Sequence, residues 1–217
     1  QSLAIEKIWQ RVFLLDSYLT AGGLTFKFTE EARSAYSLTQ LMTIMLGPVF
    51  EGQYPEHPQF AEHLGHKQTA ALISNFFGGS DVNSPESQKL AESFAFPLGL
   101  AARVNGVFVP ISAENLVENE IVKAGFAGSD AETMVPLKDI AMRLQAPSVG
   151  LTREAQHLIL AALVAQKQYE FVTSSGNRIN HRSLDLQIIW DDIVGVAKPL
   201  DEFYSPERLL TWAKLIT

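Results

Sequence analysis

The sequence contains no cysteine and has little positive charge. Without cysteine the chain forms no disulfide, no thiolate metal site and no cysteine nucleophile. This absence fits a reducing compartment, so we expect a cytoplasmic protein. Lys and Arg number 17 against 24 Asp and Glu, which gives a net charge of −7. Nucleic-acid binders usually show a basic excess, because phosphate contacts supply much of their affinity. Any nucleic-acid contact therefore has to come from a local basic patch.

Long apolar runs and nucleotide-handling motifs are also missing. The longest run, LILAALVA at Leu158–Ala165, is far shorter than the roughly 20 residues that cross a bilayer. No basic stretch followed by an apolar one begins the chain, so we expect no signal peptide. Neither a Gly-x-Ser-x-Gly turn nor a Gly-Lys phosphate loop occurs, and GHKQT at Gly65–Thr69 lacks the Gly-Lys pair. The sequence thus predicts no membrane contact, no cofactor and no nucleotide hydrolysis by this chain. Because it begins at Gln1 without a Met, we interpret it as a piece of a longer protein.

The residues that are present favour helices. Apolar residues recur at helical spacing, and Thr29, Ser84 before Pro85, and Thr152 stand where helix N-caps are expected. Residues 47–58 are typical of a loop. The predicted helices cover Ser2–Leu19, Thr29–Leu46, Gln59–Phe77, Pro85–Phe96, Ser112–Lys123, Pro136–Leu144, Thr152–Gln166 and Ser205–Leu215.

Two β-hairpins interrupt these helices, at residues 100–111 and 168–182. The first turns at Asn105-Gly106, a dipeptide that favours a tight turn with positive φ at both residues. The fold class is therefore mainly α with two β-hairpins (α+β). Since helices precede a hairpin twice, we predict tandem winged-helix-like units over residues 1–111 and 112–217, the second ending in a strand and a helix. A single irregular helical domain with two hairpins is the alternative.

The second hairpin carries the candidate nucleic-acid-binding residues. A helix that reads DNA exposes polar and basic side chains, whereas the helix before this hairpin is apolar on every side from Leu158 to Ala165. We therefore expect that helix to be buried. The hairpin and its exit carry four cationic or titratable residues that could touch a phosphate backbone without reading bases: Lys167, Arg178, His181 and Arg182. A solvated hairpin with ordinary surface charges is the simpler interpretation.

Two polar clusters invite a metal interpretation. His57, His63 and His66 lie close together in sequence beside Glu56 and Glu62, but no His-Glu-x-x-His pattern is present, and we interpret them as surface histidines. A second cluster is Asp185, Asp191 and Asp192, in a segment predicted to be a strand. No Glu-x-Lys accompanies it. We therefore predict no catalytic residue and no metal ligand, and keep a metal-dependent hydrolase as an alternative.

One family resemblance enters between Pro136 and Pro199. The stretch LTREAQHLILAALVAQKQYEFVTSSGNRINHRSLDLQIIWDDIVGVAKP resembles the C-terminal region of a family of large bacterial P-loop ATPases of unassigned function. Related ATPases occur in phage-defence loci of the BREX (phage-exclusion) type. The segment PLKDIAMRLQAPSVGLTREAQHLILAALV is similar to a helix-turn-helix-plus-wing module of such ATPases. The resemblance implies that the nucleotide-binding core lies upstream of this chain.

The expected function follows from these observations. We predict a non-catalytic module, not an enzyme by itself, that contacts the rest of a larger ATPase chain or a partner protein, with auxiliary contact to a nucleic-acid backbone. A nucleic-acid-binding winged-helix module is the alternative.

Overall fold

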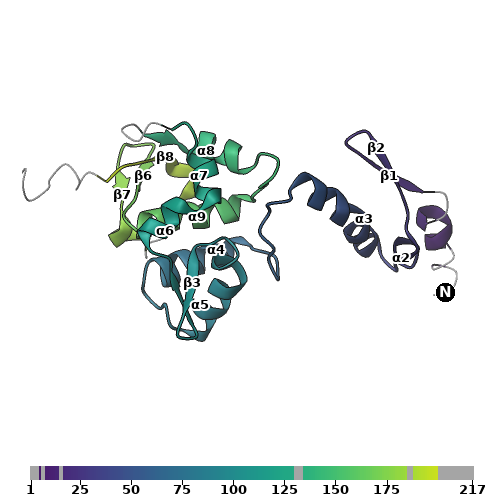
Figure 1. Ribbon diagram of the computed structural model, residues 1–217, viewed down its shortest axis with the longest axis horizontal. Helices are drawn as coiled ribbons and strands as arrows, with labels where there is room; N and C mark the ends of the chain where they lie inside the picture. The colour runs from purple at the N-terminus through teal and green to yellow at the C-terminus, as the bar shows by residue number, and fades with distance from the viewer. Residues whose placement is uncertain (1–4, 6–7, 15–16, 130–133, 185–187, 200–217) are drawn as a thin grey trace, which may run out of the picture. The chain divides into compact units, whose positions relative to one another are not determined.

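The computed structural model describes residues 5, 8–14, 17–129, 134–184 and 188–199. The chain forms two compact units, Gln1–His57 and Pro58–Thr217, and each combines helices with small antiparallel sheets (Figure 1). The predicted α+β class is confirmed at this level. In the described part of the chain, no helix has the length and apolarity that crossing a membrane requires.

The first unit contains a hairpin that the sequence pattern did not predict. A π-helical segment, Gln10–Leu14, is followed by β1 (Tyr18–Ala21) and β2 (Leu24–Lys27). The turn between the strands is Gly22-Gly23, with φ of 57° and 79°, values that glycine adopts without strain. The helix predicted over Ser2–Leu19 is therefore wrong at Tyr18 and Leu19, which belong to β1, and Gly22-Gly23 is the turn of a hairpin that was not predicted.

Two helices complete the first unit. Thr29 caps α2 (Glu30–Arg33) as predicted, with its side chain accepting from the Ala32 N–H. The predicted single helix is broken after Arg33, because Ser37 caps a new helix, α3 (Leu38–Gln53). This helix runs through Gly47 and Pro48, so the predicted loop at 47–58 was wrong over its first seven residues. Apolar residues on both sides of Pro48 keep helical spacing, which explains the continuation.

The second unit begins with two helices and a hairpin. Helix α4 (His66–Ala71) continues as the π-helix η2 (Leu72–Phe77), and α5 (Pro85–Leu90) continues as η3 (Ala91–Ala95). Helix α4 starts seven residues later than predicted because Gly65 occupies its N-cap in an extended conformation. Strands β3 (Ala101–Val104) and β4 (Val107–Pro110) pair around Asn105 and Gly106, whose φ values of 51° and 84° confirm the predicted turn.

The rest of the second unit is built around a four-stranded sheet. Helices α6 (Ala113–Glu118), α7 (Glu120–Phe126), α8 (Leu137–Leu144) and α9 (Arg153–Ala165) accompany β5 (Val135–Pro136), β6 (Glu170–Thr173), β7 (Arg178–Ile179) and β8 (Ile193–Ala197). The strand order is β5-β8-β6-β7, with every neighbouring pair antiparallel. The C-terminal strand predicted over residues 183–194 overlaps β8 only at Ile193 and Val194, because residues 190–192 form a 3-10 turn. The predicted helix from Ser205 lies outside the described residues.

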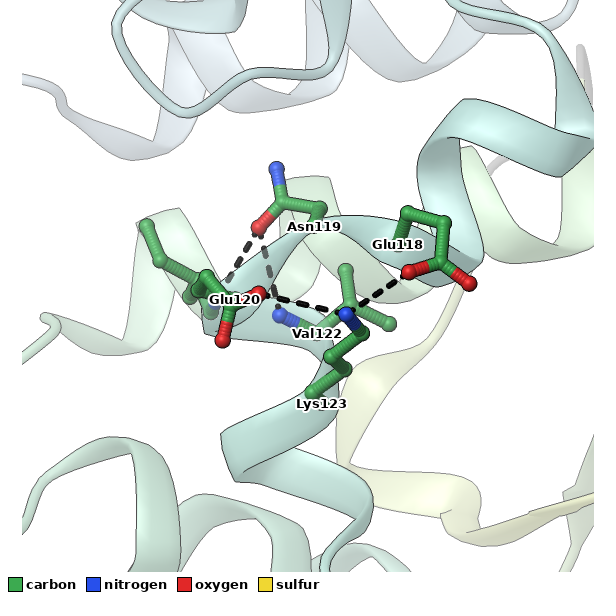
Figure 2. Close-up of polar contacts among 6 residues, drawn as sticks. Glu118, Asn119, Glu120, Val122 and Lys123 are labelled. Atoms are coloured by element: carbon green, nitrogen blue, oxygen red, sulfur yellow. Dashed lines mark hydrogen bonds and ion pairs between the residues drawn. The ribbon is translucent and has the colours of Figure 1, made fainter.

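Hydrogen bonds of Asn119 connect the two units that were predicted to be separate at residues 111 and 112. The predicted helix at Ser112–Lys123 breaks at Asn119, whose Oδ1 accepts from the N–H groups of Ile121 and Val122 at 2.9 and 3.3 Å (Figure 2). Its Nδ2 donates to the carbonyls of Leu98 and Gly99 at 2.9 and 3.3 Å. One side chain therefore ties the start of α7 to the segment before β3.

The hydrophobic core is also continuous across this predicted boundary. It runs from Leu64 through Phe76, Phe94 and Leu116 to α9 and Val196. The boundary predicted between units 1–111 and 112–217 therefore falls inside one core. The boundary between the two compact units lies instead between His57 and Pro58.

Candidate nucleic-acid interface

The second hairpin has the predicted form, but its tip is uncharged. Strand β6 pairs with β7 in the register Phe171 to Ile179 and Val172 to Arg178. The connecting turn is Ser174–Asn177, where Thr173 Oγ1 accepts from the Asn177 N–H at 3.0 Å and Gly176 has φ of 81°. The four candidate residues all lie outside this turn. Any phosphate contact would therefore have to come from the base of the hairpin.

Arg178 is committed to contacts within the chain. Its Nη1 donates to Glu170 Oε2 at 3.1 Å and to the carbonyl oxygen of Lys198 at 2.8 Å. The Glu170 side chain is only 8% exposed and that of Arg178 30%, so this ion pair is largely shielded from solvent. A buried carboxylate needs a charged partner, because leaving it unpaired is costly. Arg178 thus neutralises Glu170 in the sheet.

The other three candidate residues occupy the base of the hairpin. Lys167 is exposed in the turn between α9 and β6, with φ of 58°. His181 opens a 3-10 turn, His181–Ser183, that Asn180 caps by accepting from the Arg182 N–H at 3.0 Å. The side chain of Arg182 is exposed, and no ion pair involves it among the described residues. Lys167 and Arg182 are therefore the two candidate cations that remain accessible.

Helix α9 is buried, as the sequence predicted. Every residue from Ala155 to Val164 is buried, and the helix packs against α4, η2 and α8 of the same unit. Gln156 is buried as well, and its Nε2 donates to the carbonyl of Leu151 at 2.9 Å, whereas Arg153 in the first turn is exposed and pairs with Asp191. A DNA-reading helix needs a polar exposed face. The face of α9 that would meet a groove is covered by the preceding helices.

A histidine that the sequence pattern did not single out lies at the N-terminal half of α9. The His157 ring stacks on Trp190 with centroids 3.6 Å apart and planes 3° apart, and Trp190 meets Phe171 edge-on. Burial lowers the pKa of His157 to about 4, helped by the positive charges of Arg153 and His66 and opposed by Asp191. The imidazole is therefore neutral at physiological pH and adds no positive charge to the hairpin side of the molecule.

The aspartates considered for metal binding have other partners. Asp191 accepts from Arg153 Nη2 at 2.7 Å, and the Ser174 hydroxyl donates to Asp192 Oδ1. Both aspartates lie in a 3-10 turn, Trp190–Asp192, before β8, and not in the strand that was predicted for this segment. Asp185 lies outside the described residues. Within the described ranges, no group of three or more His, Asp or Glu side chains is placed to hold a metal ion, and this includes the histidines at 57, 63 and 66.

The one sequence signal for the His157 contact is that His157 directly precedes the apolar run Leu158–Ala165. Its partner, 33 positions away, gives no local signal. Comparison with known proteins adds no further candidate: no family model, no curated protein and no solved structure matches this chain.

Proposed function

We propose that this chain is a non-catalytic, protein-contacting module of a larger bacterial ATPase of the cytoplasm, with a winged-helix-like second unit. The order α7-β5-α8-α9-β6-β8, with β8 between β5 and β6 in the sheet, supports this architecture. A winged helix has the same order of one helix, one strand, two helices and two strands. Here β7 is an addition within the wing.

The observation that carries the proposal is the burial of α9. In a DNA-reading winged helix, the helix before the wing enters the major groove. Helix α9 instead packs against α4 and η2, and its ten buried residues run without interruption. A helix apolar on all sides is stable only inside a protein, so α9 stabilises the module and leaves its outer surfaces for contacts. Coupling to an ATPase rests on the resemblance of residues 136–199.

The parent sequence tests the ATPase part of the proposal. We expect the gene segment upstream of Gln1 to encode a phosphate loop of the Gly-x-x-x-x-Gly-Lys-Ser/Thr type, and the parent chain to hydrolyse ATP while this module alone does not. An upstream sequence without a phosphate loop would remove the ATPase assignment and leave the protein-contact assignment standing.

A nucleic-acid-binding module remains the second candidate, because Lys167 and Arg182 are exposed at the base of the wing. Fluorescence anisotropy with labelled duplex and single-stranded DNA at low salt distinguishes the two. We expect no saturable binding at concentrations on the order of 10⁻⁵ M, where non-specific DNA binders already bind. Salt-dependent binding would favour the second candidate if the Lys167→Glu/Arg182→Glu double variant abolished it. Lys138→Glu, at an exposed position of α8, is a single charge reversal outside the hairpin, and it should leave such binding intact.

A further inference from the structure

The first unit exposes an unusual amount of apolar surface on helix α3. Of the sixteen exposed large hydrophobic side chains among the described residues, eight lie within residues 1–57, and three of these lie on this helix. Leu38, Met42 and Phe50 are 52%, 37% and 52% exposed. Leu46 and Val49 are half-buried on the same side at helical spacing. We call these five residues the α3 stripe.

Helix α3 is too apolar to face water. Its core side is formed by Leu41 and Met45, the only two of its sixteen residues that are buried. With Ile44 and the α3 stripe, apolar residues cover most of its circumference, a composition typical of a helix enclosed by other elements. Among the described residues of this unit, the buried core consists of five side chains: Leu14, Ala32, Ala35, Leu41 and Met45. Domains of this length are marginally stable unless they bury more surface. We therefore expect another apolar surface to pack against the α3 stripe.

The lack of charge on α3 limits the kind of surface that can pack against the α3 stripe. The segment Leu38–Phe50 contains no charged residue, and Glu51 is the one charge on α3. A phosphate backbone or an anionic membrane surface would require cations there. A charged protein surface would lose its hydration without gaining an ion pair. The complementary surface is an uncharged apolar helix, and a second α3 meets that description.

We infer that two copies of this chain associate through their α3 stripes across a twofold axis. A twofold contact joins one surface to itself, so an uncharged stripe meets its copy without like-charge repulsion. At about 200 Å² for a large apolar residue, the exposed parts of Leu38, Met42 and Phe50 amount to roughly 300 Å² per copy. With Leu46, Val49 and the flanking threonines, the pair approaches the roughly 1,000 Å² at which specific interfaces begin. An interface of this size is at the low end for specific contacts, so we expect a weak, transient dimer. This inference rests on the first unit and is independent of the function proposed for the second.

Because the sequence contains no cysteine, disulfide formation by a single introduced cysteine can test this association without interference from other thiols. In the full chain, Met42→Cys introduces a single thiol near the middle of the stripe, and Met142→Cys introduces one at a more exposed methionine of α8, at 60%. Under mild oxidation at tens of micromolar protein, we expect Met42→Cys to form a disulfide-linked dimer at least tenfold faster than Met142→Cys. Equal rates would overturn the inference, since they would reflect random collision.

Light scattering of the full chain provides the second measurement. We expect the mass of the unmodified chain to rise toward twice that of one chain over the same concentrations. Met42→Glu should hold it at the mass of one chain with an unchanged circular dichroism spectrum. Mixing Met42→Glu with Met42→Lys should restore the dimer, which a loss of folding would not allow. A chain that stays monomeric throughout would show that the stripe is covered by another part of the protein or by a different partner, and would refute self-association.

Discussion

His157 makes a specific contribution to stability that depends on pH. Its pKa is about 4 in the folded protein against an ordinary value of 6.5, because burial against Trp190 disfavours the imidazolium. The folded state therefore takes up a proton less readily than the unfolded state. The stabilisation is complete above pH 6.5 and is lost as pH falls from 6.5 toward 4.

The size of this effect follows from the two pKa values. At pH 5.0 the unfolded imidazole is almost fully protonated, whereas the folded one binds about a tenth of a proton. Integrating this difference from pH 7.5 to pH 5.0 gives a loss of about 2 kcal/mol in the free energy of unfolding. Other groups titrate over the same range, so His157 has to be separated from them by substitution.

The variant His157→Phe isolates this contribution, because it keeps an aromatic ring over Trp190 and removes the titrating nitrogens. Urea unfolding at pH 7.5 and 5.0 should show the unmodified chain losing about 2 kcal/mol more than the variant. An NMR titration of the His157 ring should place its pKa near 4. Equal pH dependence of the two proteins, or a ring that titrates above pH 6, would refute the assignment of this pH dependence to His157.

Three further substitutions test contacts within the second unit. Asn119→Ala removes the cap of α7 and the amide that donates to two carbonyls. Urea titrations should show that it lowers the free energy of unfolding by about 2 to 3 kcal/mol. The control Asn115→Ala, on the exposed side of α6, should change this free energy by less than about 0.5 kcal/mol. Arg178→Met leaves the Glu170 carboxylate buried without its ion-pair partner and should cost about 2 to 3 kcal/mol, part of which Glu170→Gln in the same chain should recover. Gly106→Ala meets open space but requires φ near 84°, so calorimetry should show a loss of about 1 to 2 kcal/mol; no loss would mean that the turn has another conformation.

Features specified by neighbouring residues could be predicted from the sequence. Ser84, Thr152 and Thr29 cap helices where expected, since a cap and its N–H partner are three residues apart. The Asn105-Gly106 turn was likewise predicted, because both residues have to adopt positive φ. The burial of α9 followed from its composition alone. In each case the information lies within one short window.

Features that depend on distant partners could not be predicted. Arg178 was a candidate for phosphate contact until the structure placed it against Glu170 and the carbonyl of Lys198. Asn119 lies in a helical pattern, and only its contacts with Leu98 and Gly99, about twenty residues earlier, explain why the helix breaks there. The same holds for His157 and Trp190. A single sequence contains no local signal for such pairs, although it contains both members.

The burial of α9 has a consequence for how this protein moves. Amide hydrogens of a helix enclosed on every side exchange with solvent only when the whole unit opens, so those of Ala155–Val164 should be among the slowest to exchange. Because α9 packs against α4, η2 and α8, we expect the amides of these helices that face α9 to open in the same cooperative event as α9 itself.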